Sequence, residues 1–260
     1  MKVLAVIPAR YASSRFPGKP LARLGDRPVI QWVWEHVCQL SKLSRIIVAT
    51  DDSRIYQAVS DFGGEAMMTS TSHRSGTDRC GEVVRSLQDK GEFYDVVINV
   101  QGDEPFVQPA QLQTLVDCFF DAQVQIATLR TRIQSTEELL SPNNVKVICN
   151  RAGKALYFSR QPIPYLRGVD SDQWIEREAY YKHVGIYAFR SDALLSLTKL
   201  QSTTLEQAES LEQLRWLECG YSIAVQTTLF SNVGIDTPED LDAAARMLKS
   251  VDSYPNLNKN

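Results

Sequence analysis

The stretch Val3-Leu4-Ala5-Val6-Ile7-Pro8 decides how the chain begins to fold. Five consecutive apolar residues that end at a proline are typical of a strand buried on both faces, as in a parallel sheet covered by helices. Further along the chain, apolar residues at helical spacing alternate with short apolar runs. This alternation predicts an α/β domain built on a mostly parallel sheet.

The segments that follow fit this pattern. We expect strands at residues 45–50, 96–100 and 125–130, and helices beginning near residues 29, 53 and 112. Asp51-Asp52-Ser53 supplies capping side chains for the second helix, and Thr237-Pro238-Glu239 is the pattern of a late helix start. The sequence therefore predicts one domain over residues 1–249 and a C-terminal tail over residues 250–260.

The middle of the chain, roughly residues 137–190, has a different pattern. Turn-forming groups such as Pro142-Asn143-Asn144 separate short β-like segments at residues 145–149 and 155–158. The composition is not that of a flexible linker. We expect an antiparallel β region inserted into the α/β frame.

Composition excludes several classes of protein. The 28 basic and 31 acidic residues give a net charge of −3, so a broad basic surface for nucleic acid is not expected. Apolar runs are far shorter than the ~20 residues that cross a bilayer. The stretch before Arg10 is too short for a signal peptide, so we expect none. The five cysteines lack a Cys-x-x-Cys pair, which argues against disulfides and zinc. We expect a cytoplasmic protein without membrane insertion.

Ligands of open α/β sheets bind outside the carboxyl ends of the strands, so the loops there are candidate sites. The loop over residues 8–20 carries Arg10, Arg15 and Lys19, with hydroxyl groups between them. Cations and backbone N–H groups converging there would suit a polyphosphate, although the loop is not a Walker A motif. A solvated basic loop is the alternative.

Two further loops carry small polar and acidic residues. Residues 73–79 include Ser75, Gly76 and Arg79, which could contact a base and phosphates or form an ordinary turn into a helix. Asp103 follows the strand at residues 96–100, and Asp236 follows a late strand region. Such carboxylates suit Mg²⁺, which takes one or two protein carboxylates with waters and phosphates. Either aspartate could instead cap a helix.

A fourth group of residues lies in and after the inserted region. Arg160, Arg167, His183 and neighbouring tyrosines are groups expected around a polyhydroxylated acid. His183 alone could be a structural histidine. Residues 211–217 form an amphipathic stretch whose polar side chains could simply face solvent.

Taken in order, these motifs resemble those of the sugar-acid cytidylyltransferases, and more closely the branch that uses 3-deoxy-manno-octulosonate (Kdo). The likeness extends from about residue 2 to residue 249. The segments that carry it are residues 7–19, 73–79, 99–105, 144–147, 155–164, 183–187, 211–215 and 234–241.

The resemblance implies a Rossmann-like nucleotidyltransferase fold and the reaction CTP + Kdo → CMP-Kdo + diphosphate, with Mg²⁺ as cofactor. It also implies a role in lipopolysaccharide precursor synthesis and a homodimer formed largely through the inserted β region. An acceptor such as sialic acid, another ulosonic acid or a sugar 1-phosphate is an alternative. A nucleotide-sugar sensor without catalysis is another.

Carried over position by position, the resemblance assigns three groups of residues. The catalytic and metal-binding group is Arg10, Lys19, Asp103 and Asp236, of which the two aspartates would hold Mg²⁺. The nucleotide group is Ala9, Arg10, Lys19, Ser75, Gly76, Arg79, Gln101 and Asp103. The sugar group is Gln101, Arg160, Arg167, His183, Tyr187, Glu212 and Gln213.

Overall fold

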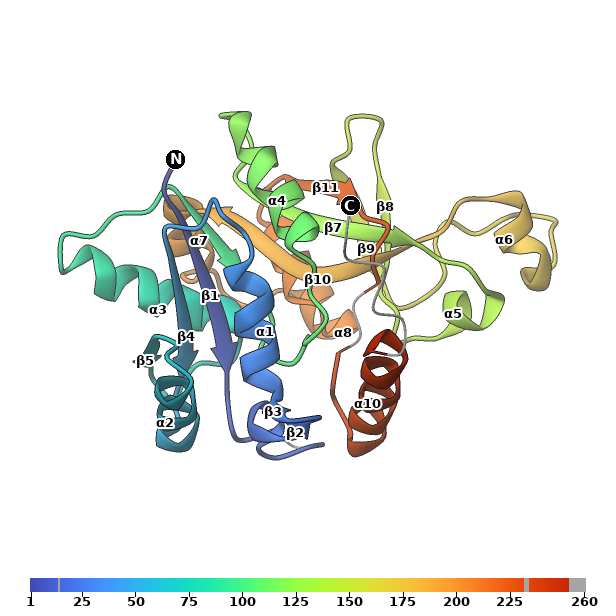
Figure 1. Cartoon of the computed structure of the whole chain (residues 1–260). Coiled ribbons are helices and arrows are strands. Elements are labelled where there is room, and N and C mark those ends of the chain that lie inside the picture. The colour runs from blue at the N-terminus through green and yellow to red at the C-terminus, as the bar shows by residue number, and fades with distance from the viewer. Residues whose placement is uncertain (14, 232–233, 253–260) are drawn as a thin grey trace.

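The structure, a computed structural model, describes residues 1–260 except 14, 232–233 and 253–260, and side chains only as far as residue 248. Its described part contains one large mixed sheet in the order β11-β7-β10-β6-β1-β4-β5, with a hairpin attached to β10 (Figure 1). The strands are β1 (Val3–Ala9), β4 (Arg45–Thr50), β5 (Ala66–Met68), β6 (Val96–Asn99), β7 (Ile126–Arg132), β8 (Lys146–Cys149), β9 (Ala155–Ser159), β10 (Tyr181–Arg190) and β11 (Ile223–Thr227). A separate small hairpin pairs β2 (Arg23–Leu24) with β3 (Arg27–Pro28).

Helices cover both faces of the sheet. They are α1 (Val29–Cys38), α2 (Ser53–Asp61), α3 (Gly76–Gln88), α4 (Pro109–Asp117), α5 (Thr136–Leu140), α6 (Trp174–Arg177), α7 (Ser191–Leu197), α8 (Thr204–Glu209), α9 (Glu212–Glu218) and α10 (Pro238–Asp252). The described residues also form 3₁₀ turns at η1 (Lys19–Leu21), η2 (Cys118–Phe120) and η3 (Ser171–Gln173). The prediction of an α/β fold with a mostly parallel frame flanked by helices is confirmed.

Strand β1 lies at the centre of the parallel part of the sheet. It pairs in parallel with β4 on one side and β6 on the other. Its side chains alternate between the two cores: Ala5 and Ile7 pack with α1, α2 and α4, whereas Leu4 and Val6 pack with α3, α7 and α9. Both faces are therefore buried, which explains the unbroken apolar run. A crevice at the carboxyl end of such a strand is where α/β proteins bind ligands.

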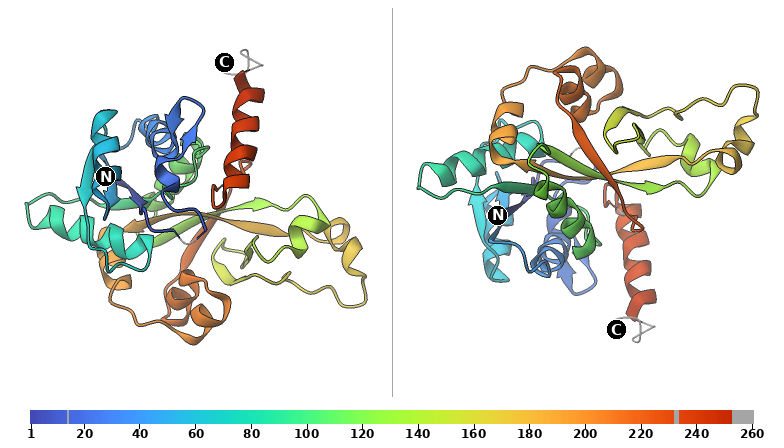
Figure 2. Two further views of the ribbon diagram at one scale, coloured as in Figure 1. Left: turned by 90° about the horizontal axis from the view of Figure 1, so that it is seen from below. Right: turned by 90° about the horizontal axis from the view of Figure 1, so that it is seen from above.

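The inserted region is part of the same sheet, which corrects one boundary of the prediction. Strand β10, at the end of the predicted insertion, lies between β7 and β6 in the main sheet and is antiparallel to both. Within the predicted insertion, the β8–β9 hairpin and the segment around α5 and α6 extend from the frame as an arm (Figure 2). The long β7 and β10 carry this arm because their pairing continues from Ile126 to Arg132.

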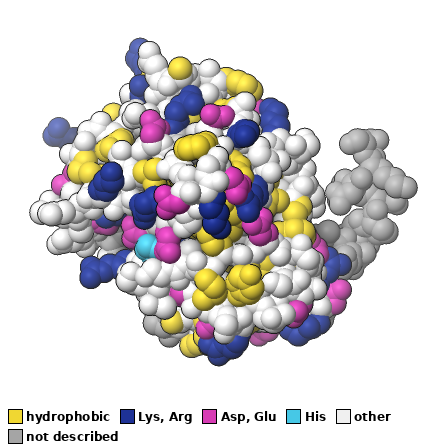
Figure 3. Space-filling model, turned by 90° about the vertical axis from the view of Figure 1, so that its left-hand side faces the viewer, with side chains coloured by type: hydrophobic (Ala, Val, Ile, Leu, Met, Phe, Trp, Pro, Cys, Tyr) yellow, Lys and Arg dark blue, Asp and Glu magenta, His cyan; other side chains and the backbone are white. Residues whose placement is uncertain are grey.

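The last helix is longer than predicted, because α10 continues to Asp252; the rest of the predicted tail, residues 253–260, lies outside the described residues. No helix in the described part of the chain has the length and apolar character needed to cross a membrane. On the face drawn in Figure 3, basic and acidic side chains are interspersed, with apolar side chains exposed between them.

Candidate active site

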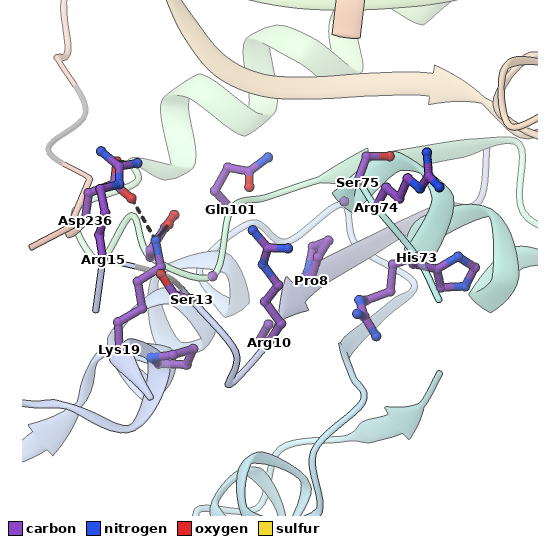
Figure 4. A pocket seen from close by; sticks show the side chains of 16 residues that line it. Pro8, Arg10, Ser13, Arg15, Lys19, His73, Arg74, Ser75, Gln101 and Asp236 are labelled. Carbon is purple, nitrogen blue, oxygen red and sulfur yellow. Dashed lines mark hydrogen bonds and ion pairs between the residues drawn. The ribbon is translucent and has the colours of Figure 1, made fainter. Parts of the chain in front are cut away.

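A cavity of about 280 Å³ opens at the carboxyl ends of β1 and β6. Every residue predicted to bind the nucleotide lines it, and so do all four predicted catalytic residues. In Figure 4, Arg10 and Gln101 lie between two groups of side chains, with Lys19, Arg15 and Asp236 on one side and His73, Arg74 and Ser75 on the other. The lining residues are Pro8, Ala9, Arg10, Ser13, Arg15, Lys19, Pro20, His73, Arg74, Ser75, Gly76, Arg79, Gln101, Gly102, Asp103 and Asp236.

One end of the cavity is a compact group of opposite charges. The Nζ of Lys19 donates hydrogen bonds to Asp103 and, over 2.9 Å, to Oδ1 of Asp236. Arg15 Nη2 lies 2.9 Å from Oδ2 of Asp236. Burial alone would lower the pKa of Lys19, but Asp103 and Asp236 together raise it above its usual value. The ammonium therefore stays charged between two carboxylates.

This group fits a hard divalent cation. Because one ammonium contacts both Asp103 and Asp236, their oxygens converge on a common point. Carboxylate oxygens are the donors that Mg²⁺ prefers, and one or two of them suffice when phosphates and waters complete the shell. The described residues contain no cluster of three or more acidic, histidine or cysteine side chains that could hold a metal ion.

Neither aspartate serves as a helix cap, which was the alternative interpretation of both. Helix α10 is capped by Thr237, whose Oγ1 accepts from Asp240 N over 3.2 Å. Helix α4 has Gln108 at its N-cap. The backbone N–H of Ile235 donates to the carbonyl of Asp103 over 2.9 Å, so the two acidic segments are tied together directly.

The other end of the cavity is formed by the first turn of α3. Ser75 is its N-cap and accepts from Asp78 N over 3.1 Å. A Cβ on Gly76 would lie 3.3 Å from Asn99 and from Pro8, so the helix start packs closely against the strand ends. Arg79 is buried and bonds Asp51 over 2.8 Å, which fixes it behind this turn. A helix N-terminus beside cations is suited to phosphate groups.

Four residues of the predicted sugar group come together next to Ser75. Thr77 Oγ1 donates to Glu212 over 2.7 Å, which joins α9 to α3. Burial raises the pKa of Glu212, although Thr77, Ser75 and Arg215 act in the opposite direction. The neighbouring Gln213 is buried.

His183 and Tyr187, on β10, complete this group. The two rings lie 5.2 Å apart, and His183 Nε2 hydrogen-bonds Thr128 Oγ1 over 2.9 Å. Burial lowers the pKa of His183 to about 3, so the ring is neutral. Burial and, to a smaller extent, the negative charge of Glu212 raise the pKa of Tyr187. Among the described residues, no group hydrogen-bonds its buried hydroxyl within normal distance and angle. A buried polar group of this kind is available to a ligand.

Arg160 lies beside this group rather than in the cavity. Its side chain donates to the backbone carbonyls of Glu209, Pro142 and Ser210, at 2.7, 3.0 and 3.4 Å. The carboxylate of Glu209 in turn accepts from Arg160 N over 2.9 Å. Arg160 therefore ties the end of β9 to the segment that leads into Glu212.

The structure does not bring Arg167 to the other predicted sugar residues of its own chain. Arg167 lines a separate hollow on the arm, together with Tyr165 and Arg177. The physical reason is the length of β7 and β10, which carry the segment near α6 away from the cavity (Figure 1).

The sequence assignment left out several residues that line the cavity. Arg15 is the most important of them, because it bonds Asp236 directly. Its signal was present, since it is one of three cations in the loop after β1. His73 also lines the cavity and bonds Glu82, but an isolated histidine before a turn gives little signal in sequence.

Comparison with known proteins agrees with this geometry. The profile of the cytidylyltransferase family matches residues 4–223, so the chain belongs to that family and is an enzyme, a nucleotidyltransferase. A solved structure of CMP:2-keto-3-deoxy-manno-octonic acid synthetase complexed with CTP has a TM-score of 0.88 and 43% identity, covering 96% of this chain and all of that one.

Curated relatives narrow the family to one branch. The chain is 51% identical over 252 residues to the 3-deoxy-manno-octulosonate cytidylyltransferase of Parabacteroides distasonis, covering 95% of this chain and 98% of that protein. It is 52% identical to the enzyme of the same name from Porphyromonas gingivalis, over 96% of this chain and 97% of that protein. The predicted membership of the 3-deoxy-manno-octulosonate cytidylyltransferases is confirmed. A 4-diphosphocytidyl-2C-methyl-D-erythritol synthase from Anaerococcus prevotii, at 15% identity and TM-score 0.61, shares the fold alone.

Proposed function

We propose that this enzyme transfers the cytidylyl group of CTP to Kdo with the assistance of Mg²⁺, giving CMP-Kdo and diphosphate. Relatives about 50% identical over nearly the whole chain bear the name of this activity. The observation that carries the proposal is the convergence of Lys19, Asp103 and Asp236 at one end of the cavity. Such a site can hold a metal and a polyphosphate together.

The reaction needs no covalent intermediate with the protein. The anomeric hydroxyl oxygen of Kdo forms a bond to the α-phosphorus of CTP and loses its proton to solvent, and the bond from that phosphorus to the diphosphate oxygen breaks. Such transfer depends mainly on positioning and charge neutralisation. Arg10, Arg15 and Lys19 line the cavity and would offset charge on the leaving phosphates. Ser75 and Gly76 would offer the N-terminus of α3 to a phosphate oxygen.

Asp103 and Asp236 would hold Mg²⁺, as their shared contact with Lys19 supports. The bound ion would polarise the α-phosphoryl oxygens and favour ionisation of the attacking hydroxyl. Gln101, at the middle of the cavity, would contact both substrates (Figure 4).

Kdo would lie against the polar group next to Ser75. Tyr187, which is buried, and Glu212, which is half-buried, are hydrogen-bonding groups suited to sugar hydroxyls, and His183 and Gln213 lie with them. Arg160 would bring a positive charge toward the sugar carboxylate, which reduces its repulsion from the nucleotide. Arg167 is left out of this assignment, because it lines a different hollow of the same chain.

We propose further that the enzyme is a homodimer in the cytoplasm that serves lipopolysaccharide synthesis. The arm exposes the large apolar side chains of Leu140, Leu156 and Tyr165, at 48%, 58% and 72%, and a partner surface would cover them. All five cysteines are free thiols, as a reducing compartment would keep them. The place in lipopolysaccharide synthesis rests on the family resemblance alone.

The decisive experiment is diphosphate release from CTP and Mg²⁺, measured separately with Kdo, sialic acid, a sugar 1-phosphate and no acceptor. Release with Kdo alone that EDTA abolishes is the expected result. Release only with another acceptor would reassign the sugar site. Tight CTP binding without release in any reaction would indicate a nucleotide-sugar sensor.

A further inference from the structure

Tyr11 lies in the loop between β1 and η1 but does not line the cavity. Its backbone carbonyl accepts two hydrogen bonds, from Ser13 N over 2.9 Å and from Gly18 N over 2.8 Å. The bond from Gly18 N closes the segment from Tyr11 to Gly18 upon itself. Arg15 lies inside the closed segment, and Lys19 follows it directly.

The ring of Tyr11 covers the far end of the loop. A Cβ on Gly18 would lie 2.8 Å from Cε2 of Tyr11 and 2.9 Å from Cζ. Gly18 also has a φ of +73°, which disfavours any side chain there. Gly18 therefore allows the chain to turn under the ring and enter η1, whose first residue is Lys19.

The ring of Tyr11 also contacts the side chain of Arg54. The guanidinium carbon of Arg54 lies 3.4 Å from the centroid of the Tyr11 ring. Arg54 is itself fixed, because its Nε and Nη2 donate to the two carboxylate oxygens of Asp52 at 3.0 and 2.7 Å. Asp52 is the N-cap of α2 and accepts from Arg54 N over 2.9 Å. A planar guanidinium anchored in this way favours stacking on an aromatic face.

We propose that Tyr11, held by Arg54, is a positioning residue that fixes Lys19 opposite Asp103 and Asp236 for nucleotide binding. A continuous set of contacts runs from the N-cap of α2 through Arg54, Tyr11 and Gly18 to Lys19. Positioning of charged groups is the main protein contribution in phosphoryl transfer, so a loosened loop weakens use of the nucleotide. This inference rests on the proposed function, since it assigns Tyr11 to the site for CTP.

The test compares Tyr11→Ala, Tyr11→Phe and Gly18→Ala with the unchanged protein. Tyr11→Ala is expected to raise KM for CTP at least about tenfold while KM for Kdo changes less than about twofold. Tyr11→Phe keeps the ring over Gly18 and beneath Arg54, so it is expected to retain normal kinetics. Tyr56→Ala is the matched control, because Tyr56 is an exposed tyrosine of α2.

Two further measurements separate positioning from a general loss of structure. Hydrogen exchange in peptides covering residues 16–22 is expected to be faster in Tyr11→Ala, because the loop that presents Gly18 N–H is loosened. Gly18→Ala is expected to raise KM for CTP. Its additional effect is expected to be smaller in a protein that already carries Tyr11→Ala, since removing the ring relieves the clash. Arg54→Met keeps the tyrosine but removes the guanidinium that stacks on it, so it is expected to raise KM for CTP and to speed exchange in the same peptides, less than Tyr11→Ala does.

Several outcomes would overturn the proposal. Unchanged exchange in Tyr11→Ala would show that the ring does not hold the loop, whatever the enzyme catalyses. Faster exchange with unchanged CTP binding would show that the loop is held but does not position the nucleotide. Equal damage from Tyr11→Phe and Tyr11→Ala would assign the role to the hydroxyl. If the unchanged protein binds no CTP, the proposed function fails and the inference fails with it.

Discussion

The carboxylates of Asp103 and Asp236 come from distant parts of the chain yet accept hydrogen bonds from the same ammonium, that of Lys19. The contact depends on three separate loops meeting above β1: the loop after β1, the loop after β6 and the segment before α10. Because opposite charges offset one another there, the acidic pair can lie in a partly enclosed cavity. Each residue of this group gives a direct test of the proposed chemistry.

Asp103→Asn is expected to reduce kcat/KM for the nucleotidyl transfer about a hundredfold, or ~3 kcal/mol of transition-state stabilisation. The amide retains the size of the side chain but removes the negative charge that would hold Mg²⁺. Steady-state kinetics at saturating Mg²⁺ provide the measurement. Asp117→Asn is the control, because Asp117 also pairs with a lysine, Lys42, but on the surface. Activity within tenfold of normal would exclude Asp103 as a metal ligand.

Lys19→Gln is expected to lower kcat/KM for CTP by about a hundredfold, through loss of a charge beside the leaving phosphates. The substitution also leaves Asp103 and Asp236 without their shared cation, so the melting temperature should fall in the absence of ligands. Lys42→Gln is the matched control at the surface pair with Asp117. Retention of normal CTP kinetics would remove Lys19 from the phosphate site.

Arg160→Ala is expected to raise KM for Kdo about tenfold while KM for CTP stays within about twofold. Arg160 lies next to the segment that carries Glu212, on the sugar side of the site. Initial rates with each substrate varied in turn give the two constants. Arg151→Ala, at the exposed turn of the β8–β9 hairpin, is the control. A parallel change in both constants would mean that Arg160 supports the fold rather than the sugar.

The pH dependence of stability reports the environment of His183. Burial lowers its pKa from 6.5 in the unfolded chain to about 3. Between these pH values the unfolded state binds more protons than the folded state. The contribution of His183 to the free energy of unfolding is therefore fully present above pH 6.5 and is lost as the pH falls toward 3. From pH 7 to pH 5.5, the normal protein should lose about 1 kcal/mol more than His183→Gln.

Urea unfolding of both proteins at the two pH values measures this difference. His36 and His73 are present in both proteins, so their contributions cancel. Equal losses in the two proteins would show that His183 titrates normally in the folded state.

The sequence by itself determined the class of the fold and the contents of the nucleotide loops. The run from Val3 to Ile7 predicted a strand buried on both faces, and β1 is buried in that way. The pattern of apolar residues was sufficient to predict the fold class, because it shows which faces of each strand or helix are buried. The loop carrying Arg10 and Lys19 was a candidate site because its charges follow a strand directly in the chain.

Only the tertiary structure decided which distant residues meet. From the sequence, Asp236 could have been a helix cap. In the structure Thr237 caps the helix, and Asp236 accepts a hydrogen bond from Lys19. Arg167 shares a segment with Arg160, yet β7 and β10 carry it onto the arm. Local patterns do not contain this information, because strand order and strand length arise from pairings between residues far apart in sequence. The contact between Tyr11 and Arg54 depends on the same long-range pairing, that of β1 with β4.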